Sequence, residues 1–94
     1  MKTFPVRPDE AARLHDWLLD RIAAYLERSP SAIDPAVPLA EYGMDSVSAL
    51  SLCGDLEDEL RLFVDPTLVW DYPTVNALVA HLTTLLPAAT EGVR

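Results

Sequence analysis

Apolar residues recur at helical spacing in separate stretches of this chain, and prolines stand between those stretches. Residues 8–27 place apolar side chains three or four positions apart, and the same spacing returns over residues 45–61 and 74–86. No stretch alternates convincingly between apolar and polar residues, as a half-buried strand does. A chain of 94 residues has room for one modest core. The pattern therefore predicts a single all-helical domain.

Proline and capping residues set the limits of the first two expected helices. Pro8 suits a first helical position, where its missing N–H would be unpaired anyway, and Pro30 stops the helix near residue 28. Asp45 can cap the free N–H groups of a second helix over residues 45–61. A long loop, residues 29–44, lies between the two helices. We expect three isolated apolar residues to anchor it: Ile33, Val37 and Leu39.

Two shorter segments complete the predicted fold. Asp65 and Pro66 repeat the start signal of a cap followed by proline, but Pro73 comes so soon that only about two turns fit. Thr74 can cap a last helix that ends near Pro87. We therefore predict a four-helix bundle with a short third helix and a long first loop. Its expected boundaries are a flexible tail, the helical domain and a second flexible tail, at residues 1–7, 8–86 and 87–94.

The second expected helix carries two apolar stripes. We predict that the first stripe faces the core, and it consists of Ala49, Leu52, Cys53, Leu56 and Leu60. The second stripe is rotated away from the core and consists of Val47, Leu50 and Gly54. Asp55 and Asp58 add negative charge beside it, so one interpretation of this face is a docking surface. The alternative is scattered apolar residues on an ordinary solvated acidic face.

Charge and cysteine content narrow the classes of partner. The chain has 15 acidic and 7 basic residues, a net charge of −8, which disfavours nucleic acid and anionic lipid and favours basic partner surfaces. Cys53 is the only cysteine, which fits a reducing, cytoplasmic location. No apolar run reaches membrane-spanning length, and one cysteine with two distant histidines gives no metal-ligand spacing. We expect a cytoplasmic monomer without a metal site.

The segment Gly43-Met44-Asp45-Ser46-Val47 places a serine where the loop meets the second helix. Gly43 can adopt backbone angles closed to other residues, and Asp45 caps the helix that begins beside Ser46. The helix start offers unpaired N–H groups and partial positive charge, which favour an anion. A phosphodiester on Ser46 is therefore chemically well placed, although capping alone also explains a serine at a helix start.

With this segment the chain resembles the acyl carrier protein family, whose attachment motif is Gly, any residue, Asp, Ser and an aliphatic residue. The first-loop anchors Ile33-Asp34-Pro35 and Leu39 also resemble those of the family. The segment joining the last two helices is most similar to that of polyketide synthase carriers, and it reads Leu68-Val69-Trp70-Asp71-Tyr72-Pro73-Thr74. The Asp before the serine departs from the usual peptidyl carrier motif. Ser51 and Gly54 stand where fatty-acid carriers often have Glu and Met.

The resemblance implies that Ser46 bears a covalent 4'-phosphopantetheine arm derived from coenzyme A, whose thiol holds acyl groups as thioesters. It further implies a carrier in polyketide or related secondary-metabolite biosynthesis, not an enzyme. The implied partners are a phosphopantetheinyl transferase and acyl-loading and acyl-processing synthase enzymes. Given the acidic charge, we expect those enzymes to dock through basic patches. Met1 and the short tails favour a free-standing chain.

Two alternatives come from other classes of protein. A helical protein-interaction module without a prosthetic group would explain the acidic surface equally well. A serine hydrolase would need a base within hydrogen-bond reach of Ser46, and the only histidines, His15 and His81, belong to no recognised catalytic motif. We expect both histidines to be exposed helix residues. Cys53 is interpreted as a buried core residue, not as a reactive thiol.

Overall fold

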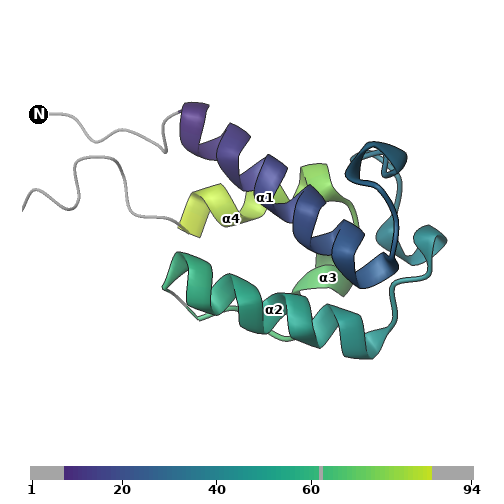
Figure 1. Cartoon of the computed structure of the whole chain (residues 1–94). Coiled ribbons are helices and arrows are strands. Elements are labelled where there is room, and N and C mark those ends of the chain that lie inside the picture. The colour runs from purple at the N-terminus through teal and green to yellow at the C-terminus, as the bar shows by residue number, and fades with distance from the viewer. Residues whose placement is uncertain (1–7, 62, 86–94) are drawn as a thin grey trace, which may run out of the picture.

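The chain folds into the predicted all-helical arrangement in the computed structural model, which describes residues 8–61 and 63–85. Four α-helices succeed one another: α1 (Pro8–Leu26), α2 (Ser46–Leu60), α3 (Leu68–Asp71) and α4 (Val75–Leu85). Figure 1 shows α2 running antiparallel to α1, while α4 lies behind α1 and packs against it. The long first loop closes one end of the bundle, where α2 begins. No strand occurs in the described ranges.

Caps define the two long helices much as their sequences predict. The Asp45 carboxylate accepts a hydrogen bond from the Ser48 N–H at 2.8 Å, so Asp45 is the N-cap of α2. Both helices end in a residue with left-handed backbone, Glu27 after α1 and Arg61 after α2. The Arg61 N–H still reaches the Glu57 carbonyl, which satisfies one of the last free carbonyls of α2.

The third helix differs from its prediction, because it has one turn and begins at Leu68. The Asp65 carboxylate accepts hydrogen bonds from the backbone N–H and the hydroxyl of Thr67, at 2.9 and 2.8 Å. These bonds close a tight turn over residues 65–67, so the backbone there does not enter the helix. The expected start at Asp65 and Pro66 was therefore wrong, although the short third helix itself is present.

The core is apolar throughout the described part of the chain, where no polar or charged side chain is buried. On α1 the apolar residues at helical spacing form a stripe, in which Leu14, Leu18 and Ile22 are buried and Ala11 and Tyr25 are half-buried. The core joins all four helices and the first loop, and it consists of Leu14, Leu18, Ile22, Ala23, Ile33, Leu39, Met44, Ala49, Leu52, Cys53, Leu56, Val64, Leu68, Val69, Val75, Leu78 and Leu82. Burial of these side chains is the main stabilising contribution to the bundle.

The first loop packs against the bundle, as its apolar anchors predict. Ile33 and Leu39 are buried, and Val37 is half-buried. Two short 3-10 helices that the sequence analysis did not predict, η1 (Pro30–Ala32) and η2 (Leu39–Tyr42), shape the loop. Its backbone is tied to the start of α4 by the Leu39 N–H, which reaches the Pro73 carbonyl at 2.8 Å. The predicted flexible tails, residues 1–7 and 87–94, lie outside the described residues.

Candidate functional site

The predicted motif falls where the first loop joins α2. Gly43 follows η2 with φ of 93°, in the left-handed region that favours glycine. The next side chain, Met44, is buried, and Asp45 has an extended backbone. Ser46 is the first residue of α2, and its side chain is exposed. An anchored turn therefore presents the serine at the surface.

The electrostatic setting of Ser46 suits an anionic substituent. Hydrogen bonds from the backbone N–H of Ser48 lower the pKa of the Asp45 carboxyl, so this cap stays ionised at neutral pH. Within the described ranges, neither the hydroxyl nor the backbone N–H of Ser46 forms a hydrogen bond. A free hydroxyl and a free backbone N–H at a helix start fit a phosphate ester on Ser46 Oγ.

The histidines are less exposed than predicted, and neither serves Ser46. His15 is half-buried on α1, with its Nδ1 3.9 Å from the Asp16 carboxylate. The ring of His81 stacks on Tyr72 with 4.0 Å between ring centroids, which covers part of it. In the described part of the chain neither histidine is hydrogen-bonded to Ser46, which is the contact that a serine–histidine pair of a hydrolase makes.

The two stripes of α2 lie as the sequence predicts. Leu52, Cys53 and Leu56 are buried, and Leu60 at the end of the helix is half-buried. On the other face, Val47 is 72% exposed and Leu50 is 55% exposed. The second stripe is therefore an apolar surface that begins beside Ser46.

Asp55 does not contribute free charge to that surface, and this part of the prediction was wrong. Its carboxylate accepts a hydrogen bond from the Tyr25 hydroxyl and lies 3.6 Å from the Arg21 guanidinium. The hydrogen bond to Asp55 raises the pKa of Tyr25. The Arg21 guanidinium in turn lies 4.9 Å from the centroid of the Trp17 ring. Asp55 thus joins α2 to α1, and the exposed carboxylate near the second stripe is Asp58.

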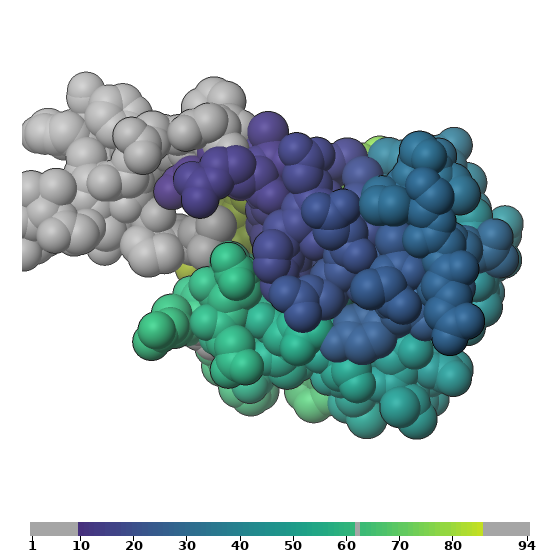
Figure 2. Space-filling model, viewed as in Figure 1, coloured from purple at the N-terminus to yellow at the C-terminus, as the bar shows by residue number. Residues whose placement is uncertain are grey.

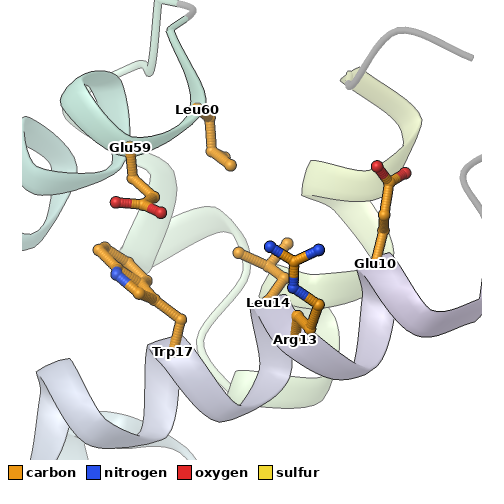
Figure 3. Close-up of a pocket in the computed structure, with 6 residues that line it drawn as sticks. All are labelled: Glu10, Arg13, Leu14, Trp17, Glu59 and Leu60. Atoms are coloured by element: carbon orange, nitrogen blue, oxygen red, sulfur yellow. The ribbon is translucent and has the colours of Figure 1, made fainter. Parts of the chain in front are cut away.

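The chain also forms a groove, but at the opposite end of α2 from Ser46. It has a volume of about 320 Å³ and lies where Figure 2 shows the surface hollowed between the start of α1 and the end of α2. Figure 3 shows the lining side chains: Glu10, Arg13, Leu14, Trp17, Glu59 and Leu60. Since α2 rises about 1.5 Å per residue, its end lies roughly 20 Å from Ser46. The groove therefore offers no substrate cleft beside the serine.

Tyr42 is a further residue near Ser46, and it makes two contacts that hold the first loop. Its hydroxyl accepts a hydrogen bond from the Asp34 N–H at 2.8 Å, and the Arg28 guanidinium lies 5.4 Å from the centroid of its ring. Asp34 and Arg28 are not spaced from Tyr42 as neighbours on one helix or strand are. No periodic pattern in the sequence therefore indicates these two contacts.

Cys53 is buried, which confirms its interpretation as a core residue. Burial raises the pKa of its thiol, and the nearby Glu57 and Asp65 carboxylates raise it further. The reactive thiolate is thus disfavoured.

No group of three metal-ligating side chains occurs among residues 10–61 and 63–85. None of the described helices is both long enough and apolar enough to cross a membrane.

Comparison with known proteins adds an independent line of support. The family of phosphopantetheine attachment sites matches residues 16–82, a region that includes the whole of α2. A phenolphthiocerol/phthiocerol polyketide synthase from Mycobacterium tuberculosis contains a segment that is 38% identical over 71 residues, or 76% of this chain. A 6-methylsalicylic acid synthase from Arthrobotrys oligospora is 43% identical over 77 residues, or 77% of this chain. The matched segment is 4% of the length of each synthase polypeptide.

Solved structures of similar proteins share the fold. A free-standing peptidyl carrier protein from a secondary metabolic pathway of Acinetobacter baumannii superimposes with a TM-score of 0.77. That protein is 41% identical in sequence, and the match covers 80% of this chain and 94% of the solved one. The helical bundle therefore accounts for nearly the whole of that solved chain.

Proposed function

The chain belongs to the phosphopantetheine attachment-site family of carrier domains, and from this membership we propose that Ser46 bears the prosthetic group. Members of this family act as non-catalytic carriers, and so does this chain. The group, 4'-phosphopantetheine, supplies a thiol that holds acyl groups as thioesters. The observation that carries the assignment to Ser46 is the unengaged hydroxyl at the first residue of α2, inside the matched region.

Each residue around the serine has a distinct role in this proposal. Gly43 provides the left-handed turn, and Met44 fastens that turn to the core. Asp45 caps α2, so the helix starts at a fixed residue. Ser46 supplies the oxygen to which the group is attached, and the partial positive charge at the start of α2 favours the negative charge of the phosphate.

We further propose that the carried intermediates belong to polyketide or related secondary-metabolite biosynthesis. The similarity to two polyketide synthases supports this assignment, and the segment from Leu68 to Thr74, which comprises α3 and the turn before α4, resembles that of polyketide carriers. We place the carrier domain at residues 8–86 of a monomer. A cytoplasmic location is supported by the single, buried cysteine. A chain with one cysteine forms no internal disulfide, and the absence of disulfides is usual for proteins of a reducing compartment.

Carrier domains of this kind are modified by a phosphopantetheinyl transferase and interact with synthase enzymes. For this chain, we propose that these enzymes dock on the face of α2 formed by Val47, Leu50, Gly54 and Asp58. The first two residues supply exposed apolar area beside Ser46, and Asp58 supplies negative charge that attracts a basic patch. A tethered arm raises the effective concentration of substrate at the docked enzyme, so weak and reversible docking is sufficient.

Intact-mass measurement tests the proposed function. The purified chain is treated with coenzyme A and a broad-specificity phosphopantetheinyl transferase, and we expect the mass to rise by one phosphopantetheine per chain. A reaction without transferase is the control and should leave the mass unchanged. Failure to gain the group with several different transferases would contradict the carrier function and favour an interaction module.

A further inference from the structure

Tyr42 connects three parts of the first loop through one side chain. Its hydroxyl receives the Asp34 N–H at 2.8 Å, which joins the end of η2 to the middle of the loop. Its ring lies under the Arg28 guanidinium, two residues beyond the end of α1, at a distance typical of a cation–π contact. The half-buried ring therefore holds the end of the loop against its beginning.

The backbone between Tyr42 and Ser46 has little freedom of its own. The Gly43 N–H donates to the Ala40 carbonyl at 3.1 Å, and the Met44 N–H donates to the Leu39 carbonyl at 3.3 Å. Because Met44 is buried and Asp45 caps α2, every residue of this short segment is fixed on at least one side. A shift of Tyr42 would consequently move the turn that precedes Ser46.

Contacts with α4 and the residues just before it also hold the loop. The contribution of Tyr42 to the turn can therefore be separated from the attachment of the loop to the bundle. Leu39 is buried and its N–H reaches the Pro73 carbonyl, while the Asn76 N–H reaches the Pro35 carbonyl at 3.0 Å. These contacts keep the loop attached to the bundle without Tyr42. Removing the Tyr42 hydroxyl should therefore loosen the turn before Ser46 and leave the helical core intact.

We propose that Tyr42 is a positioning residue, which fixes the turn before Ser46 and so sets how readily a phosphopantetheinyl transferase binds the chain. The inference rests on the proposed function, because it takes Ser46 as the modified serine. If the transferase binds only the ordered turn, its apparent affinity is its intrinsic affinity multiplied by the fraction of chains in which the turn is ordered. Loosening the turn lowers that fraction and therefore weakens binding. The catalytic step on the bound chain is unaffected.

The variant Tyr42→Phe removes the hydroxyl and keeps the ring under Arg28. We expect the KM of the transferase for the chain to rise, by at most about tenfold, which is the limit set by the loss of one hydrogen bond, with little change in kcat. Tyr25→Phe is the matched control, because it also removes a phenol hydrogen bond but one that joins α1 to the middle of α2. We expect the control variant to keep the wild-type KM.

Amide hydrogen exchange provides a readout that needs no transferase. In Tyr42→Phe the amides of Gly43 and Met44 should exchange faster, because the turn that protects them opens more often. The amides of Leu52 and Cys53, in the middle of α2, should keep their protection. This pattern would locate the change in the turn and exclude a general loss of stability.

The proposal is overturned if Tyr42→Phe leaves both the KM and the exchange of Gly43 and Met44 unchanged. It is also overturned if Tyr25→Phe raises the KM by the same factor, because the effect would then reflect overall stability. If the wild-type chain is never modified, the proposed function fails instead. In that case the exchange measurement alone still decides whether Tyr42 fixes the turn.

Discussion

The two faces of α2 lie on one helix but are determined by different requirements. Leu52, Cys53 and Leu56 are enclosed by the core, where close packing decides which side chains fit. Val47 and Leu50 lie on the opposite face and are mostly exposed to solvent, so the fold places no comparable demand on them. The buried face therefore explains how the chain folds, whereas the exposed face is the one on which we propose that partner enzymes dock.

Gly54 sharpens this contrast because nothing in the fold requires a glycine there. It lies inside α2 without a left-handed backbone, and a Cβ at this position would meet no atom within 4 Å. Glycine inside a helix costs about 1 kcal/mol relative to alanine. A helix surface that stays flat at this position allows a partner to approach closely, as the docking proposal requires.

The largest expected effect separates the two faces by stability. Leu56→Ala should lower the free energy of unfolding by about 2 to 5 kcal/mol, because it opens a cavity in the core. Leu50→Ala should lower it by less than about 1 kcal/mol, because this side chain is 55% exposed. Denaturant unfolding of both variants measures the difference. Similar losses would mean that the exposed face is also a packing face.

The contact between α1 and α2 should have an intermediate effect. Tyr25→Phe should cost about 1 kcal/mol, the net value of one hydrogen bond. Asp58→Asn is the control on the exposed face and should leave stability unchanged. Because the pKa of Tyr25 is raised above 10.0, the hydrogen bond contributes fully below about pH 10 and is lost as pH rises through the raised pKa. The free energies of unfolding of wild type and Tyr25→Phe, measured against pH, should therefore converge at strongly alkaline pH. A difference that stays constant over this range would contradict the contribution of the hydrogen bond.

Gly54→Ala should change stability and docking in opposite directions. We expect the free energy of unfolding to rise by up to about 1 kcal/mol, since alanine is the better helix former. Attachment of the prosthetic group or acyl loading should become slower, because the added methyl group obstructs the partner. Ser51→Ala, on the same exposed face, adds no bulk and serves as the control for loading. A more stable variant that loads at the wild-type rate would remove Gly54 from the docking surface.

Asp58→Lys should have the smallest effect on the fold, with an unchanged unfolding midpoint and helical circular dichroism. At low salt it should slow attachment or loading by about two- to fivefold, and the difference should shrink as salt screens the charges. Asp20→Lys, an equal charge change at an exposed position of α1, is the control. Equal slowing by both variants would show that net charge alone acts, without a docking site on α2.

Most of the fold could be predicted because it depends on local patterns. Apolar periodicity and caps such as Asp45 and Thr74 place three helices to within about two residues. The third helix was predicted too long, because the Asp65 carboxylate closes a turn with Thr67 instead of starting a helix. Side-chain hydrogen bonds of this kind compete with helix formation, and the sequence contains the same residues in either case.

In the site, too, the arrangement of residues that are neighbours in the sequence could be predicted, whereas contacts between distant residues could not. Gly43, Asp45 and Ser46 are neighbours, so their arrangement follows from a motif in the sequence. The pairing of Asp55 with Tyr25 joins residues 30 positions apart, and it depends on how α1 crosses α2. A tyrosine on the core stripe of α1 does indicate that its hydroxyl needs a partner, but not which one.

The assignment of the prosthetic group to Ser46 can be tested by locating the attached group on individual serines of α2. Ser48 and Ser51 lie on the same helix as Ser46 and provide matched controls. After treatment with coenzyme A and a transferase, intact mass should show one phosphopantetheine on wild type, Ser48→Ala and Ser51→Ala, and none on Ser46→Ala. A Ser46→Ala chain that still gains the group would contradict the account, because the attachment site would then lie elsewhere.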